Sequence, residues 1–186
     1  MSSPDSSERP PSGEHVPDDA ALRLGETSYI VLGLLERAEP ATPYDLKQIA
    51  KISTGYFWSV PHTQLYTECA RLAGAGLLEE QRESSGRRRR VYRLTPRGRE
   101  RLQSWRTEPT GALYELRDAG TLKLFFGADP ATLSTVQLDA HRARLAAYER
   151  LLSELPDAPA GQRLALELGI GQEHAFIDFW SRLHDA

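Results

Sequence analysis

Four consecutive arginines, Arg87–Arg90, follow Gly86 near the middle of the chain. Residues 82–108 hold ten Lys and Arg against three Asp and Glu, although the whole chain has a formal net charge of −3. A guanidinium fork pairs with phosphate oxygens and can enter a narrow minor groove. The local charge therefore indicates a phosphate-bearing partner, with double-stranded DNA favoured over RNA, an acidic membrane or a merely solvated surface.

A second group of polar residues lies on the segment before this run. Leu65, Cys69 and Leu72 recur at helical spacing, so they are expected to face a core. The opposite side of that helix then presents hydroxyls, an amide and a phenol, which suit base edges and phosphates in a major groove about 12 Å wide. The candidate DNA-binding residues here are His62, Thr63, Gln64, Tyr66, Thr67 and Arg71. An ordinary exposed polar surface is the alternative.

The elements expected around these residues follow a recognisable order. A buried helix through Tyr29–Leu35 ends at Pro40, a second begins at Thr42-Pro43, and a third is expected to start with Ser59 as its cap. Two strand-like runs, Leu77–Arg82 and Arg90–Leu94, flank a Ser-Ser-Gly loop, and a further helix runs from Thr95 to about Trp105. Helix, helix, helix, hairpin, helix is the order of a winged helix-turn-helix domain, whose third helix and hairpin contact DNA.

The C-terminal part is expected to be helical throughout. The segment Gly111–Phe126 is read as a helix, Asp129-Pro130 caps a long helix to about Leu155, and a last helix follows Pro156–Gly161. Spacings of three and four residues give these helices apolar seams, but a two-helix hairpin buries little surface alone. We therefore expect a second copy to cover it, at an interface formed by Leu138, His141, Leu145, Tyr148, Leu152, Leu155, Phe176, Phe179, Trp180 and Leu183. Packing of both helices on their own chain is the alternative.

The fold class predicted from this pattern is mainly α, with a two-stranded wing and a C-terminal helical dimerisation domain. Residues 1–22 are rich in Ser, Pro and Asp and have few large apolar side chains, so they are expected to form a disordered tail. Residues 23–108 are assigned to the winged helix-turn-helix domain. Residues 109–186 are assigned to the dimerisation domain, which is also the candidate ligand-sensing part.

Several classes of protein are disfavoured by what the sequence lacks. Cys69 is the single cysteine, which excludes an intramolecular disulfide and a thiolate metal site. There is no signal-peptide pattern and no apolar run of about 18–20 residues, so we expect a cytoplasmic protein with no membrane partner. Motifs for a phosphate loop, a nucleophile elbow or a zinc protease are missing, so we expect no enzyme, no cofactor and no metal.

In combination, residues 24–102 resemble the PadR-like transcriptional regulators. The matching motifs are Leu34-Leu35, Tyr44-Asp45-Leu46, Gly55–Trp58, Gln64–Tyr66, Leu72–Leu77, Arg87–Arg90 and Tyr92–Gly98, whereas Pro43 stands where the family often has glycine. The resemblance implies a homodimer that reads a pseudo-palindromic operator, usually a repressor released by a small molecule. It also adds Tyr44 to the candidate DNA-binding residues.

Two further hypotheses concern ligands and partners. In some proteins of this resemblance, aromatic side chains at the dimer interface stack on flat ligands, which makes Trp105 a candidate for binding a small aromatic effector. A packing tryptophan is the alternative. A winged-helix domain can also be a protein–protein interaction module without DNA readout. An apolar exposed third helix would favour that function, whereas the polar face favours DNA.

Overall fold

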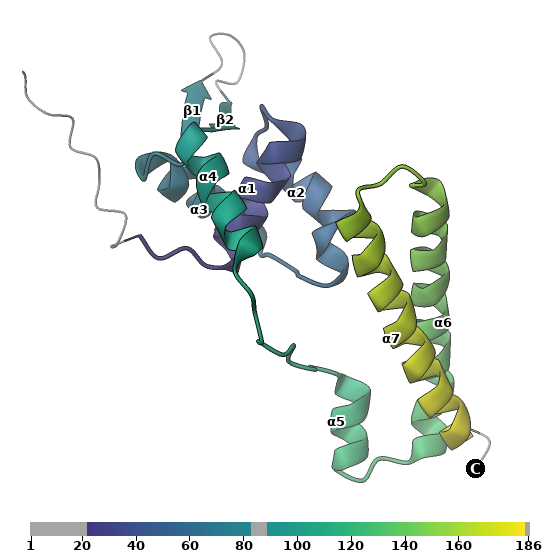
Figure 1. Cartoon of the computed structure of the whole chain (residues 1–186). Coiled ribbons are helices and arrows are strands. Elements are labelled where there is room, and N and C mark those ends of the chain that lie inside the picture. The colour runs from purple at the N-terminus through teal and green to yellow at the C-terminus, as the bar shows by residue number, and fades with distance from the viewer. Residues whose placement is uncertain (1–21, 83–88, 185–186) are drawn as a thin grey trace, which may run out of the picture. The chain divides into compact units, whose positions relative to one another are not determined.

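A computed structural model describes residues 22–82 and 89–184 of the chain (Figure 1). Residues 1–21 of the expected N-terminal tail and residues 83–88 of the wing, with Arg87 and Arg88, lie outside the described residues, whereas Leu22 packs against the core. The chain divides into two compact units, one ending at Thr110 and the other beginning at Gly111. The described parts are mainly helical with one two-stranded antiparallel sheet, as the sequence predicted.

The N-terminal unit has the element order of a winged helix-turn-helix domain. Its elements are α1 (Glu26–Ala38), α2 (Pro43–Lys51), the short 3-10 turn η2 (Thr54–Tyr56), α3 (His62–Gly74), β1 (Leu78–Arg82), β2 (Arg90–Leu94) and α4 (Pro96–Thr107). The two strands pair antiparallel, with Leu78 opposite Leu94 at one end and Arg82 opposite Arg90 at the other. We call this ribbon, with the connection between its strands, the wing.

The core of this unit forms around α1. Val31, Leu32 and Leu35 are fully buried, which explains why this segment is apolar on nearly every side. They belong to one cluster with Leu46 of α2, Leu65, Cys69 and Leu72 of α3, Tyr92 of β2 and Leu102 of α4. Each helix contributes one apolar face, so the polar face of α3 is left on the surface.

Local capping fixes where two of these helices begin. The Thr42 hydroxyl accepts the backbone N–H of Asp45, and the Asp45 carboxylate accepts the backbone N–H of Thr42, a reciprocal capping box. Thr95 accepts the N–H of Gly98 in the same way at the start of α4.

The predicted start of α3 was wrong. The helix begins at His62 with Pro61 as the N-cap residue, so Ser59 does not cap it. The physical reason is that a residue before proline is held away from the helical region, which keeps Val60 out of the helix. No side chain caps this end of α3.

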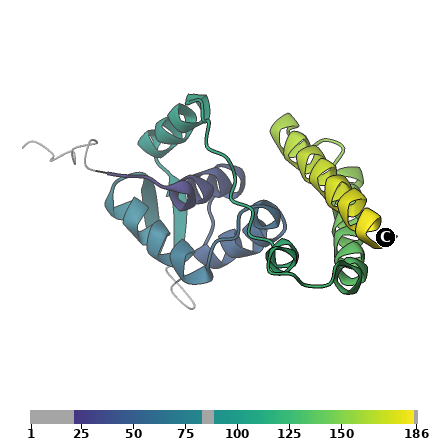
Figure 2. The same cartoon turned by 90° about the horizontal axis from the view of Figure 1, so that it is seen from below.

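The C-terminal unit contains α5 (Ala119–Phe125), α6 (Pro130–Glu154) and α7 (Ala160–His184). The two long helices run side by side in both views (Figures 1 and 2).

The expectation of a helix over Gly111–Phe126 was wrong for its first part, because residues 108–118 have no regular structure and α5 starts only after the Asp118 cap. Pro109 and Gly111 disfavour helix, and Leu113 has no partner in its own unit, being 93% exposed.

The predicted apolar seam of α6 packs against α7 of the same chain. Leu138, Tyr148 and Trp180 are buried there without a second copy. Gly169 of α7 lets the two helices approach closely, since a Cβ at this position would lie 3.0 Å from the Tyr148 ring. Packing of the two helices on each other within one chain therefore accounts for these contacts. Leu164 and Leu168, on the other side of α7, stay exposed. None of the described helices is long and apolar enough to cross a membrane.

Candidate nucleic-acid interface

The exposed face of α3 carries most of the predicted DNA-binding residues. His62, Thr63, Gln64 and Thr67 are exposed, and Tyr66 is 42% exposed. The helix is held from behind by its buried leucines, so this face is rigid in its own unit. Because no side chain caps the helix, its first N–H groups and its positive dipole end are open to an anion such as a phosphate.

Contacts within the helix organise three of these side chains. The rings of His62 and Tyr66, one turn apart, are 4.7 Å apart between centroids and tilted by 57°. The Thr67 hydroxyl donates a hydrogen bond to the backbone oxygen of Thr63 at 3.1 Å, which leaves its own oxygen able to accept. The face thus offers donors and acceptors of the kind that read base edges.

Arg71, predicted as a DNA contact, is engaged elsewhere. Its guanidinium donates two hydrogen bonds to Glu68, at 2.6 and 2.9 Å, and a third to the Ser28 hydroxyl at 3.0 Å. Ser28, on α1, is buried and donates in turn to Glu68 at 2.5 Å. Burial alone would raise the pKa of Glu68, but the hydrogen bonds from Arg71 and Ser28 lower it. The cluster ties α3 to α1 and holds Arg71 toward the protein.

At the end of the ribbon next to the connection between its strands, Arg90 lies where the sequence predicted an exposed arginine. It is paired with Glu80 of the neighbouring strand, the two side chains approaching to 3.5 Å. Arg82 approaches the same carboxylate to 3.5 Å. Arg89 is exposed and contributes to lowering the pKa of Asp45, behind the hydrogen bonds from Thr42 and against the raising effect of burial.

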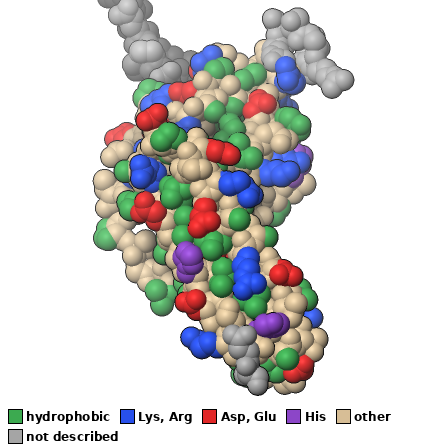
Figure 3. Space-filling view, turned by 90° about the vertical axis from the view of Figure 1, so that its right-hand side faces the viewer, with side chains coloured by type: hydrophobic (Ala, Val, Ile, Leu, Met, Phe, Trp, Pro, Cys, Tyr) green, Lys and Arg blue, Asp and Glu red, His purple; other side chains and the backbone are tan. Residues whose placement is uncertain are grey.

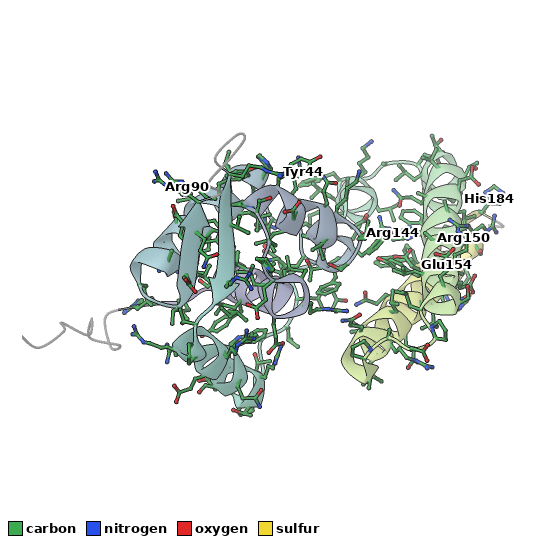
Figure 4. The ribbon with its side chains drawn as sticks, turned by 90° about the horizontal axis from the view of Figure 1, so that it is seen from above. Tyr44, Arg90, Arg144, Arg150, Glu154 and His184 are labelled. Carbon is green, nitrogen blue, oxygen red and sulfur yellow. The ribbon has the colours of Figure 1, made fainter. Side chains whose placement is uncertain are left out.

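The start of α2 is joined to the wing by backbone hydrogen bonds. Ala41 and Tyr92 form an antiparallel bridge, with N–H···O distances of 2.9 and 3.2 Å. Tyr44, 55% exposed, therefore lies beside the wing, and Figure 4 shows it with Arg90 at one edge of the N-terminal unit. Tyr44 and Arg90 therefore lie at one edge of this unit (Figure 4), and Arg89 acts electrostatically on Asp45, the residue next to Tyr44.

Glu80 also lies at this candidate interface, although it was not among the predicted residues. The carboxylate of Glu80 is held between two arginines and the hydroxyl of Tyr92. The signal was present in the alternation of a strand, because residues 80 and 82 must point to the same face. A count of net charge could not show that Glu80 lies between the two arginines.

Trp105 is partly exposed on α4. Its ring stacks on Tyr29 of α1, with centroids 4.6 Å apart and planes 10° from parallel, and 43% of the residue remains exposed. Packing accounts for one side of the indole. A ligand role would need a second flat ring on the exposed part of the indole, and it stays a prediction.

The predicted dimer-interface residues divide into two groups. Leu138, His141, Tyr148 and Trp180 are buried within the hairpin, and His141 lies 2.6 Å from Glu173 and stacks on Phe176. In the second group, Leu155 and Phe179 are 41% and 38% exposed, and Leu145, Leu152 and Leu183 are half-buried.

Further apolar side chains of this unit lie open that the sequence analysis did not select. Phe125 and Phe126 are 80% and 78% exposed, and Leu122 and Tyr114 are also exposed. Figure 3 shows hydrophobic side chains among charged ones on one face of the molecule. Monomeric proteins rarely expose many large apolar groups together, so these residues favour a covered surface.

Metal chemistry has no support in the described part of the chain. It contains no group of three or more His, Cys, Asp or Glu side chains placed to hold a metal ion. Cys69 is fully buried, and burial raises the pKa of its thiol to about 12. The site can form hydrogen bonds and neutralise anionic charge, which are the properties of a nucleic-acid interface.

The three-helix core, the wing and the exposed third helix define a DNA-binding protein of the winged helix-turn-helix class. Residues 31–104 match the model of the Transcriptional regulator PadR-like family, so this part of the chain is a PadR-like domain. Residues 116–185 match a second model, the Virulence activator alpha C-terminal region.

Individual relatives agree with this assignment. The chain is 28% identical over 136 residues to the negative transcriptional regulator PadR of Bacillus subtilis, covering 67% of this chain and 74% of that protein. It is similar to the crystal structure of Bacillus subtilis PadR in complex with operator DNA, with a TM-score of 0.74, 25% identity and coverage of 85% and 96% of the two chains. The virulence activator AphA of Vibrio cholerae matches with a TM-score of 0.64, 25% identity and coverage of 86% and 96%.

Proposed function

We propose that this regulator is a homodimeric repressor that binds a pseudo-palindromic DNA operator and is released by a small-molecule effector. The observation that carries the DNA-binding part is the exposed polar face of α3 beside an arginine-bearing wing. A similar structure, that of Bacillus subtilis PadR, holds operator DNA. The expected place of action is the cytoplasm, as the match to a family of DNA-binding regulators implies.

The two halves of the interface have different roles in this proposal. Gln64 and Thr67, in the middle of the exposed face of α3, select bases, since amides and hydroxyls make directional hydrogen bonds to base edges. His62 and the uncapped N-terminus of α3 bind a phosphate. The wing residues Arg87–Arg90 and the neighbouring Tyr44 bind the backbone, which gives affinity and little sequence information. Arg71 is reassigned from DNA contact to support of α3.

A second copy of the chain would cover the apolar surface of the C-terminal unit. Leu164, Leu168 and Phe179 follow one another at helical spacing on the exposed side of α7. Their solvent exposure in a single chain is costly, and burial against the same surface of a partner would recover about 25 cal/mol for each Å². We therefore place the dimer contact on this side of α7.

The proposed effector is a small aromatic compound that stacks on the exposed part of Trp105. The same Bacillus subtilis PadR has been solved in complex with p-coumaric acid, a flat aromatic acid. Binding of such a ligand should quench or shift the fluorescence of Trp105, whereas Trp105→Phe should abolish that change. A compound that releases DNA equally well from both proteins would remove Trp105 from the proposal.

Activation of transcription is the second candidate function. It is favoured by the match of residues 116–185 to a virulence-activator region and by the similarity to AphA. The DNA-binding step is the same for both functions, so a promoter–reporter assay separates them. Deletion of the gene should raise expression from a repressed promoter and lower expression from an activated one.

The DNA-binding proposal is tested by gel shift against the protein's own promoter region at two salt concentrations. We expect sequence-preferring binding that weakens steeply as salt rises, since phosphate contacts release counterions. Gln64→Ala should change sequence preference, costing about 1–3 kcal/mol at one base pair, whereas neutralising Arg87–Arg90 should weaken binding to every sequence and flatten the salt slope. Absence of salt-sensitive, sequence-preferring binding would instead favour a protein-interaction module.

A further inference from the structure

The ribbon of the wing brings two arginines face to face at the end next to the connection between its strands. The strand register pairs Arg82 with Arg90 and Glu80 with Tyr92. Side chains alternate along a strand, so all four lie on one face of the ribbon. Like charges directly opposite one another destabilise an antiparallel pair, and an exposed wing would be expected to avoid them unless something lay between.

Glu80 is the group between them. Its Oε1 atom lies 3.5 Å from Nε of Arg82 and 3.5 Å from Nε of Arg90. Its Oε2 atom accepts a hydrogen bond from the Tyr92 hydroxyl at 3.1 Å, which holds the carboxylate in place. The Glu80 side chain is only 23% exposed, whereas those of Arg82 and Arg90 are 66% and 52% exposed. One fixed carboxylate therefore faces two guanidinium groups that remain open to solvent.

We propose that Glu80 restrains the wing, limiting how strongly Arg82 and Arg90 bind DNA phosphate. The proposal rests on the DNA-binding function proposed above. A carboxylate and a phosphate offer a guanidinium the same kind of oxygen partner, so the two compete for these arginines. A weaker backbone contact lowers affinity for all sequences equally, so base contacts of α3 supply a larger share of the total binding free energy.

A purely structural role for Glu80 makes the opposite prediction. If the carboxylate only relieved repulsion between Arg82 and Arg90, its loss would distort the wing and leave DNA binding weaker or unchanged. If it restrains the arginines, its loss makes binding tighter. The sign of the change in affinity therefore decides between the two roles.

The test compares the full-length chain with Glu80→Gln on a mixed-sequence DNA duplex, by fluorescence anisotropy over a range of salt concentrations. The substitution keeps the size of the side chain and an acceptor for Tyr92 while removing the charge. We expect binding at about 0.1 M salt to tighten roughly tenfold for each bound wing, and the slope of log affinity against log salt to steepen by about 1 for each wing. Glu80→Asp moves the charge back by one methylene and should give a smaller gain in DNA affinity. It provides the test if Glu80→Gln does not fold.

Two controls make the result specific. Glu100→Gln removes one charge from an exposed position of α4 and should not change binding by more than about twofold. In an Arg82→Gln/Arg90→Gln background, Glu80→Gln should have no further effect.

Unchanged or weaker binding by folded Glu80 variants, an equal gain from Glu100→Gln, or a gain that persists without the two arginines would each overturn the restraint. A wild-type chain with no salt-sensitive DNA binding would overturn the proposed function, and the restraint with it. A wild-type chain that binds DNA while the Glu80 variants gain nothing would overturn the restraint alone.

Discussion

The single thiol of the chain lies on the inner side of α3, the helix that carries the proposed DNA-binding face. Cys69 packs among the core leucines of α3 and is fully buried, and desolvation, aided by the charge of Glu68, raises its pKa to about 12. A thiolate is the reactive form, so the native protein holds almost none of it at neutral pH. We expect no redox role for this cysteine.

This gives a direct chemical prediction. With an aromatic disulfide reagent at pH 8, the native chain should react at least a hundredfold more slowly than the same chain in denaturant, because reaction needs local unfolding. The release of coloured thiolate measures both rates. Fast labelling of the native protein would show that the thiol is accessible and that α3 opens readily from the core.

The Ser28–Glu68–Arg71 cluster makes α3 depend on a charged group. Glu68→Gln should lower the free energy of unfolding by about 1–2 kcal/mol at pH 7, since it weakens hydrogen bonds to a charged partner. The folded pKa of Glu68 is below its ordinary value because the hydrogen bonds from Arg71 and Ser28 outweigh desolvation. Its stabilisation is therefore complete above the ordinary pKa, about 4.3, and is lost as pH falls through the lower folded value.

Urea unfolding of the wild type and of Glu68→Gln at pH 7, 5 and 3.5 tests this dependence. The difference between the two proteins should be constant from pH 7 to 5 and smaller at pH 3.5. Glu100→Gln, an exposed carboxylate of the same unit, serves as the control and should differ little from the wild type at any pH. A difference for Glu68→Gln that grows toward acid would contradict the assignment of the charge.

At the scale of single residues, sequence reasoning succeeded where periodicity decides orientation. The burial of Leu65, Cys69 and Leu72 leaves Gln64 and Thr67 exposed, as a helical period requires. Periodicity did not indicate the hydrogen bond of Arg71 to Ser28, because the two residues are 43 positions apart in the sequence. A long side chain on the edge of a helix face can turn to either side, and only the packing of α1 decides which.

Among the elements, the α6–α7 hairpin contains an unusual polar contact. Nδ1 of His141 lies 2.6 Å from a Glu173 oxygen, and the two side chains are 7% and 4% exposed. Arg144 approaches the other oxygen of Glu173 to 3.4 Å from the rim of the hairpin. Figure 4 shows Arg144 on α6. Breaking a buried pair is costly because the remaining group keeps no partner, whereas replacing both members by apolar groups often is not.

We therefore predict that Glu173→Ala lowers the free energy of unfolding of the hairpin by about 3 kcal/mol. The double variant His141→Leu/Glu173→Leu should recover most of that loss. Thermal unfolding followed by circular dichroism at 222 nm measures both, with His174→Ala, exposed on the same helix, as the control. A double variant as unstable as Glu173→Ala would mean that the polar pair itself stabilises the hairpin.

Element boundaries were predictable where local chemistry sets them. Thr42-Pro43, Thr95-Pro96 and Asp129-Pro130 each place a capping side chain before a proline that suits the first helical turn, and all three helices begin there. The segment after Pro109 was not predictable, because Leu113 and Tyr114 look like a helix face but find no core in their own unit. Short helices form only when packing supports them.

At the scale of the whole molecule, the same apolar pattern had two solutions. Heptad spacing on α6 indicates that something packs along it, but spacing alone does not distinguish a helix of the same chain from one of a partner. In this chain α7 occupies the seam, and Leu164, Leu168 and Phe179 remain on the outer side. The proposed dimer therefore moves from the α6 seam to the outer side of α7.

This placement predicts that Leu168→Lys disrupts the dimer while leaving each chain folded. Leu168 is 66% exposed in the single chain, so a lysine fits without disturbing the hairpin, but in a dimer it would put a charge into an apolar contact. Light scattering after size exclusion should show a shift from dimer to monomer at micromolar concentration. Circular dichroism should show unchanged helix content.

The matched control is His174→Lys, which adds a positive charge to an exposed position of α7 away from that apolar side. It should stay dimeric. Loss of dimerisation should also weaken binding to a two-half-site operator far more than binding to a single half-site, because two linked recognition helices bind cooperatively through a raised effective concentration. If Leu168→Lys remains dimeric, the outer side of α7 is not the contact, and the exposed Phe125 and Phe126 become the next positions to substitute.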